Sequence, residues 1–356
     1  MWLPQAIALV GIIASLSAAH AQDFHIQDVG LTKNLDLSQL KPGTVLFSDQ
    51  QSAAANGGSG SADGAPNLID FADWARTQPV QKKFLALYPG YAEPTVSKAA
   101  SAGVAGGPAV EKLTMYVAQA RFRLDRAPDT LGLARYASLA FLEKIDPAIK
   151  HKAIAADDVN PLKDQQGIGN ENPRRKWCIG RSNLVCIQSA YKLEGKIPIG
   201  IILVNKLRDT AKKIPDQIDF ESELSQLSPA DIDQAGLQAL TGLDTAVAGV
   251  LVQNIFYVNQ IMKFGKFFAV FQNDPADANK TVVTAFMALA IETGVLDKKK
   301  QFETVPVLRN LVPAQVLMGQ SSFNSGNSIS AGLPKYARNE IATIAGLLAH
   351  DTAQHP

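Results

Sequence analysis

The sequence has almost no excess of charge of either sign. Its 356 residues contain 34 Lys and Arg against 33 Asp and Glu, so the formal net charge at pH 7 is +1. A protein that binds nucleic acid through charge alone needs a basic excess to neutralise phosphates. We therefore expect no nucleic-acid partner. Because 46% of the residues are hydrophobic, the chain can form a packed core. A protein that is disordered as a whole is therefore excluded.

The sequence patterns of several catalytic classes are missing. The chain contains no G-x-S-x-G, no HExxH and no Walker A pattern, and no G-x-G-x-x-G follows an expected strand. Histidine is scarce, and His151 is the internal candidate for a general base or a metal ligand. Its place at the end of Pro147-Ala-Ile-Lys-His favours a surface position. These gaps favour a protein that is not an enzyme, with no bound cofactor or metal.

The first five residues contain no Lys or Arg, but the segment that follows has the features of a signal peptide. Residues 6–18 are apolar, and Ala19-His20-Ala21 fits a cleavage site between small residues. We expect a signal peptide over residues 1–21, cleavage after Ala21, and export to the periplasm or the extracellular space. The alternative is an uncleaved anchor, because residues 2–21 are just long enough to span a bilayer. Later apolar runs are short or interrupted by polar residues, so no transmembrane segment is expected in the mature chain.

Cysteine is also scarce, since Cys178 and Cys186 are the only two. The residues at their centre, 180–183, are Gly-Arg-Ser-Asn, which is typical of a turn. In an exported chain, two cysteines around a turn most simply form a disulfide, and two free buried thiols are the alternative. A redox dithiol prefers two intervening residues, and a metal site needs further ligands nearby.

The composition changes along the chain and predicts three parts. Residues 50–65 are almost entirely Ala, Gly, Ser, Asn, Gln and Asp, and such small or polar side chains cannot bury enough area to become ordered. We therefore expect a signal peptide (1–21), a flexible N-terminal arm with a Gly/Ser/Ala linker (22–66), and a single α+β domain (67–350).

Periodicity within the domain predicts both strands and helices. Residues 111–126 fit a strand or a helix equally well, and 284–293 fit a helix as well as a strand. The turn-rich segment 273–279 separates two long apolar runs, 247–271 and 282–291, and suggests a hairpin. Further strands are expected at 43–47, 184–193 and 218–227, and helices at 131–144, 199–213, 229–242 and from Pro334 onward.

The last of these helices is amphipathic. Ala337, Ile341, Ile344, Ala345 and Leu348 form its apolar stripe, and polar residues are expected to face solvent, namely Lys335, Arg338, Asn339 and Glu340. The element order predicts an α+β fold with an antiparallel sheet packed against this C-terminal helix. A helix-grip arrangement, in which a curved sheet wraps the last helix around an apolar cavity, fits the same order.

Two groups of charged residues are candidate sites. Arg174, Arg175, Lys176 and Arg181 lie around Cys178 and offer a patch for an anionic lipid head group, a polyanion or an acidic partner, or form an ordinary exposed basic loop. Pairs of acidic residues suit general acid and base catalysis, or simply form solvated faces. These pairs are Asp157 with Asp158, Glu221 with Glu223, and Asp231 with Asp233.

The leading hypothesis is an exported, non-enzymatic protein that binds an apolar or amphipathic small molecule or a protein partner. It depends on the expected export, the expected disulfide, the apolar hairpin region and the shortage of catalytic groups. The alternative is a secreted hydrolase that uses a pair of carboxylates on cell-wall or polysaccharide material.

Overall fold

The computed structural model describes residues 24–29, 35–49, 69–70, 76, 78–85, 113–155, 178, 181, 184–192, 217–258, 262–292 and 327–353. Among these residues strands predominate and helices are few, which confirms a mainly sheet α+β fold. The expected signal peptide (1–21), the linker (50–65) and the expected helix at 199–213 lie outside the described residues.

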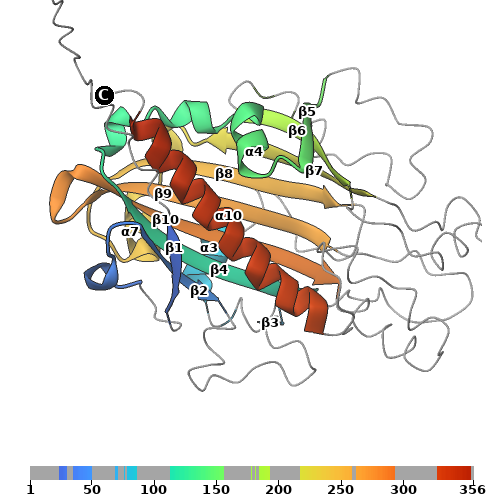
Figure 1. Ribbon diagram of the computed structural model, residues 1–356, viewed down its shortest axis with the longest axis horizontal. Helices are drawn as coiled ribbons and strands as arrows, with labels where there is room; N and C mark the ends of the chain where they lie inside the picture. Colours follow the sequence, from blue (N-terminus) through green and yellow to red (C-terminus); the bar gives the residue numbers. More distant parts are fainter. Residues whose placement is uncertain are drawn as a thin grey trace, which may run out of the picture.

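One mixed sheet of ten strands forms the body of the protein, and Figure 1 shows its arrangement. The strands are β1 (His25–Asp28), β2 (Thr44–Asp49), β3 (Ile69–Asp70), β4 (Leu113–Leu124), β5 (Ile149–Ala153), β6 (Leu184–Lys192), β7 (Gln217–Gln226), β8 (Val247–Val258), β9 (Met262–Asp274) and β10 (Asp277–Glu292). Their order is β1-β2-β4-β10-β9-β8-β7-β6-β5, and β3 pairs with β4. The β1–β2 pair is parallel and the other pairs are antiparallel.

The helices differ greatly in length. They are α3 (Pro79–Leu85), α4 (Leu139–Ile145), α7 (Gln234–Thr241) and α10 (Asn327–Ala353), with 3-10 turns η1 (Leu37–Gln39), η2 (Pro128–Thr130), η3 (Leu133–Tyr136) and η6 (Pro229–Asp231). The long helix α10 crosses one face of the sheet diagonally (Figure 1). Its residues Ala337, Ile341, Ala345 and Leu348 are buried in one cluster with side chains of β2, β4, β9 and β10. We call this side of the sheet the helix face.

Strand β4 resolves the ambiguity of the expected element at 111–126. Tyr116, Ala118 and Phe122 belong to the cluster on the helix face, whereas Met115 belongs to a second cluster on the opposite face. A strand alternates its side chains between two faces, and here both faces are buried. The resulting apolar run on both faces resembles a helical pattern in the sequence.

The expected hairpin is formed by β9 and β10, whose register joins Asp274 to Asp277 at the turn. The described part of the segment 284–293, which ends at Glu292, belongs to β10 and is not a helix. Ala285 and Phe286 pack into clusters on opposite faces of the sheet, as neighbouring residues of a strand do. Residues 247–271 contain β8 and most of β9, and Gly265 lies inside β9. A Cβ atom on this glycine would lie 2.7 Å from Leu289 Cδ2, so a larger residue here would displace the Leu289 side chain.

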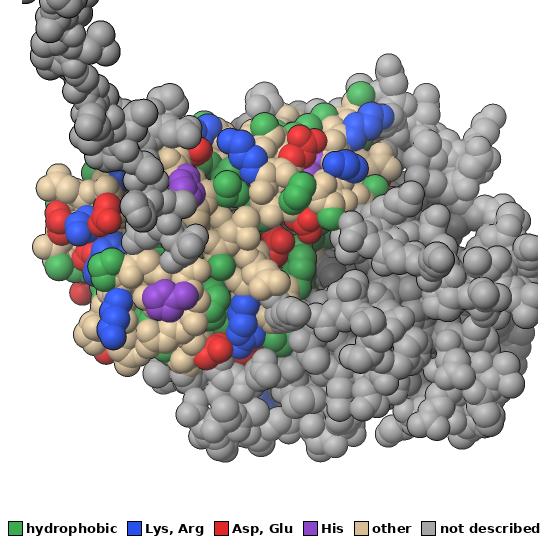
Figure 2. Space-filling model, in the orientation of Figure 1, with side chains coloured by type: hydrophobic (Ala, Val, Ile, Leu, Met, Phe, Trp, Pro, Cys, Tyr) green, Lys and Arg blue, Asp and Glu red, His purple; other side chains and the backbone are tan. Residues whose placement is uncertain are grey.

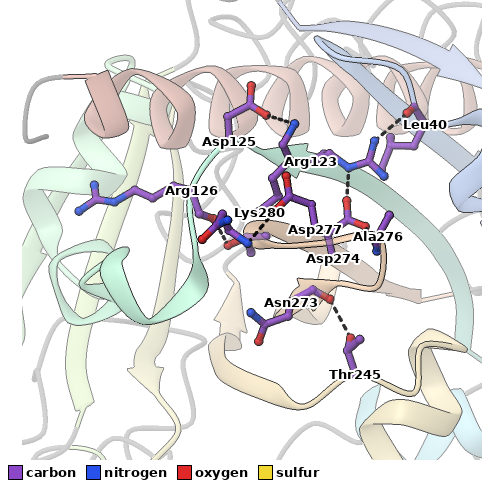
Figure 3. Close-up of polar contacts among 12 residues, drawn as sticks. Leu40, Arg123, Asp125, Arg126, Thr245, Asn273, Asp274, Ala276, Asp277 and Lys280 are labelled. Atoms are coloured by element: carbon purple, nitrogen blue, oxygen red, sulfur yellow. Dashed lines mark hydrogen bonds and ion pairs between the residues drawn. The ribbon is translucent and has the colours of Figure 1, made fainter.

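Acidic and basic side chains are interspersed on the face seen in Figure 2, in keeping with the small net charge. Polar contacts fix the turn end of the β9–β10 hairpin (Figure 3). Arg123 on β4 pairs with the buried Asp274, and its Nη1 donates to Leu40 O at 3.2 Å. On the other side, Thr245 Oγ1 donates to Asn273 O at 2.8 Å. The loop before β2 and the loop before β8 are thereby attached to the hairpin.

Several expected helix boundaries are wrong. The expected helix at 131–144 divides into η3 and α4, because the Ser138 hydroxyl caps α4 by accepting from Phe141 N at 3.3 Å. The helix expected after Ser228 begins later, since Asp233 is the residue that caps α7. Helix α10 begins at Asn327, before the expected start at Pro334. Proline removes one backbone donor, and here the helix continues through it.

The segment interpreted as an N-terminal arm supplies two strands of the sheet. Every residue of β2 is buried, and Val45 and Phe47 belong to the cluster on the helix face. The pairing of β2 with β4 supplies the hydrogen bonds that a detached arm would lack. The described part of the arm is therefore attached to the domain through β1 and β2, whereas the proposed boundaries at residues 21 and 66 stay predictions.

Candidate functional site

A pocket of about 180 Å³ lies between the helix face of the sheet, α4 and α10. Apolar side chains form most of its lining. They come from four sides: Phe47 on β2, Phe141, Leu142 and Ile145 on α4, Phe267 on β9, and Ile341, Ile344 and Leu348 on α10. The alternation of side chains along β-strands places Phe47 and Phe267 on the helix face of the sheet, and the helical spacing of α10 points its apolar stripe toward them.

A row of alanines makes room for this pocket. Ala120 on β4 lies opposite Ala285 on β10, and Ala285 lies opposite Ala269 on β9. All three line the pocket. Larger residues end the row, with Phe47 opposite Ala120 and Leu251 opposite Ala269. Protein cores are normally packed to crystal density, so short side chains on three adjacent strands beneath a helix leave space that a ligand can occupy.

The polar side chains of the lining lie mainly toward the β5 side of the sheet. His151 on β5 shares a hydrogen bond of 2.8 Å between its Nδ1 and Ser189 Oγ. Gln253 on β8 donates from Nε2 to Ser222 Oγ at 3.1 Å. Two carboxylates complete this polar end of the pocket, Asp146 after α4 and Glu340 on α10.

Glu340 has an unusual environment for a carboxyl group. Burial, with a further contribution from the negative charge of Asp146, raises the pKa of Glu340 to about 8. Its carboxyl group is therefore mostly protonated at neutral pH. The sequence prediction that Glu340 faces solvent is wrong, because it lies between Ala337 and Ile344 on the pocket side of α10. The sequence pattern already indicated this position, because Glu340 falls within the helical spacing of the apolar stripe.

His151 is half-buried and lines the pocket instead of lying on an open surface. Burial lowers its pKa, against the opposing effect of Glu143 and Asp146. The imidazole is thus mainly neutral at pH 7. Its strand β5 is paired with β6, which holds the imidazole at the sheet instead of on the expected surface position.

The carboxylate pairs expected from the sequence do not line this pocket. Glu221 and Glu223 lie on one face of β7, as expected, but they are buried, and Glu223 accepts from Asn254 Nδ2 at 2.7 Å. Their neighbours Phe220 and Leu224 line the pocket from the other face of β7, so the sheet separates the two glutamates from it.

The second acidic pair has local structural contacts. Asp231 accepts from Ser228 Oγ at 2.6 Å. Asp233 caps α7, and a hydrogen bond from Lys83 holds its pKa below the usual value. Asp157 and Asp158 lie outside the described residues.

The two cysteines form a disulfide, and Cys178 and Cys186 pack with Ile154. Of the expected basic patch, Arg181 is exposed, whereas Arg174, Arg175 and Lys176 lie outside the described residues, so the patch stays a prediction. Among the residues that the structure describes, no cluster of three or more His, Cys, Asp or Glu side chains is suited to a metal ion. No helix within the same residues is both long and apolar enough to cross a membrane.

Comparison with known proteins identifies no family. No family model and no curated protein matches the sequence. Among solved structures, the chain is similar to the Zhui aromatase/cyclase from Streptomyces sp. R1128, with 10% identity and a TM-score of 0.32. The match covers 66% of this chain and 93% of the other. A likeness at this level carries no argument about activity or ligand.

Proposed function

We propose that this protein is a non-enzymatic binder of an apolar or amphipathic small molecule, which occupies the pocket beneath α10. The observation that carries the proposal is the alanine row, Ala120, Ala285 and Ala269, facing an otherwise well-packed helix. A concave, mainly apolar pocket with a few polar groups at one end is the usual form of a small-molecule site.

We also propose a helix-grip arrangement and export of the protein. The diagonal position of α10 across the sheet supports the first (Figure 1). The disulfide between Cys178 and Cys186 supports the second, because disulfides persist in oxidising compartments such as the periplasm or the extracellular space. The hydrolase alternative receives no support from Glu221 and Glu223, which are buried on the face opposite the pocket.

The test uses delipidated full-length protein and the neutral fluorescent probe Nile red. We expect saturable binding, and we expect Ala285→Phe to weaken it by at least about tenfold by filling the pocket. The matched control is Ala278→Phe, which adds the same side chain at an exposed position on β10 and should leave binding unchanged. Should Ala285→Phe fail to fold, Ala269→Leu makes a smaller intrusion from the neighbouring strand. Absence of probe binding, or equal binding by the folded pocket and control variants, would overturn the proposal.

A further inference from the structure

We propose that the pocket selects amphiphiles with a positively charged amine head group, which lies beside Glu340 and Asp146 while the apolar tail lies over the alanine row. This inference rests on the proposed function and narrows it to one charge class of ligand. A neutral or anionic amphiphile of the same tail would enter the same pocket with lower affinity.

The charge of the lining carries the inference. Among the described residues that line the pocket, the ionisable groups near its polar end are Asp146, Glu340 and His151, and none of the described lining residues is Lys or Arg. A fatty-acid carboxylate would meet the charge of Asp146, would oppose ionisation of Glu340, and would find no Lys or Arg among the described lining residues. An ammonium group would instead gain two carboxylate partners in a partly desolvated site, where ionic interactions are stronger than in water.

The two carboxylates come from different elements and converge on one space. Asp146 is the C-cap residue of α4, and its Oδ1 accepts from Ala148 N at 2.9 Å, which fixes the position of the side chain. Glu340 projects from the middle of α10, and the charge of Asp146 acts on it. Acidic side chains are visible beside α10 and below α4 in Figure 2. Neither Asp146 nor Glu340 has an ion-pair partner among the described residues.

The other ionisable groups around α10 do not neutralise this pair. On β1 and β2, Asp28 and Asp49 are paired with Arg338 of α10. Tyr116 on β4 donates to Asp49. The remaining charged groups near the polar end belong to α4 and β5; they are Glu143, Lys144, Lys150 and Lys152, all exposed and none in the pocket lining.

A cationic ligand would also change the protonation of Glu340. Burial and Asp146 keep this carboxyl protonated near neutral pH in the free protein. An ammonium group beside it favours the ionised form, so binding releases a proton between about pH 6 and 8. The affinity for a permanently charged ammonium therefore rises with pH over this interval, whereas the affinity for a neutral alcohol stays constant.

The experiment compares decyltrimethylammonium, decylammonium, decanoate and 1-decanol as competitors of Nile red, with the full-length delipidated protein at pH 8. We expect each ammonium compound to bind at least about tenfold more tightly than decanoate and decanol. Glu340→Gln should remove this preference and leave decanol binding unchanged. Glu143→Gln, which removes an exposed acid of α4 outside the lining, should keep the preference.

The outcomes separate the two proposals. If none of the compounds and no Nile red binds, the proposed function fails. If decanol binds but decanoate binds as tightly as the ammonium compounds, ligand binding stands and the charge preference is wrong. Retention of the preference by Glu340→Gln also contradicts the assignment of this site. Should that variant not fold, Asp146→Asn tests the second carboxylate in the same assay.

Discussion

Arg338 on α10 donates from Nη1 to Asp49 Oδ2 on β2 at 3.0 Å, and the side chain of Asp49 is fully buried. The hydroxyl of Tyr116 donates to the same oxygen at 2.8 Å. The guanidinium group also pairs with Asp28 on β1 at 2.6 Å and lies 4.4 Å from the centre of the Phe47 ring. One arginine thus attaches the long helix to the edge strand β1 and to its neighbour β2.

The two carboxylates bound by Arg338 should differ greatly in energetic importance. We expect Arg338→Met to destabilise the protein by about 3–5 kcal/mol, because it leaves Asp49 buried without its cation. Asp28→Asn should cost less than about 1 kcal/mol, since the side chain of Asp28 is 54% exposed. Urea denaturation followed by circular dichroism measures both values. Similar losses in the two variants would contradict this assignment.

Arg121 lies on the face of β4 opposite the helix face and forms hydrogen bonds with three segments that are far apart in the sequence. Its Nε donates to Thr284 Oγ1 at 3.1 Å, and its terminal nitrogens donate to the backbone oxygens of Leu35 and Thr241. Burial lowers the pKa of Arg121 to about 10, so the group remains charged at neutral pH. Its removal leaves two buried carbonyl groups without these donors.

We expect Arg121→Met to cost about 2–4 kcal/mol, because each buried acceptor left without a donor costs about 1–3 kcal/mol. Arg121→Lys should lose less, since an ammonium group can still reach one of the two acceptors. Hydrogen exchange should also become faster in residues 35–40 in the methionine variant, because this segment is released from the sheet. Unchanged exchange there would show that Arg121 does not hold the segment.

Local patterns predicted the elements whose partners are close in the sequence. The β9–β10 hairpin follows from two apolar runs around 273–279, and β6 and β7 follow from similar short runs. The strands at 111–126 and 284–293 could not be distinguished from helices, because both faces of the sheet are covered and the polar alternation is lost. No local sequence pattern indicated that Arg121 is buried, because two of its hydrogen-bond partners are 86 and 120 residues away in the sequence.

The pocket depends on strand register, which a single sequence does not show. Ala120, Ala269 and Ala285 are unremarkable alanines in apolar segments until β4, β9 and β10 place them side by side. Glu340 was detectable in principle, because it lies at helical spacing within the apolar stripe of α10. The general preference of charged side chains for solvent outweighed that spacing in the sequence interpretation.

The disulfide should contribute modestly to stability. Cys178 and Cys186 are separated by 8 residues, and closing so short a loop restricts the unfolded chain by about 2–3 kcal/mol. We expect the double variant Cys178→Ala, Cys186→Ala to lose about this amount in urea denaturation. Reductant should lower the stability of the unmodified protein and leave that of the double variant unchanged. A reductant effect on the double variant would indicate another cause.

Glu340 should make the stability of the free protein depend on pH. Its pKa is about 8 in the folded protein against an ordinary value of 4.5, so the folded state binds the proton more tightly than the unfolded state. The free energy of unfolding therefore falls as pH rises from about 5 to 8, by at most about 1.4 kcal/mol per pH unit from this group, and levels off above. Glu340→Gln resembles the protonated acid and lacks this contribution.

We accordingly expect Glu340→Gln to match the unmodified protein near pH 5 and to exceed it in stability at pH 8 to 9, where Glu340 must ionise in an apolar site. Urea denaturation across this range measures the difference. Glu143→Gln, at an exposed position on α4, controls for the loss of one negative charge and should follow the pH dependence of the unmodified protein. A stability difference between Glu340→Gln and the unmodified protein that stays constant from pH 5 to 9 would mean that Glu340 titrates normally. Glu340 would then already be ionised in the free protein at neutral pH, and the rise of ammonium affinity between about pH 6 and 8 would be absent.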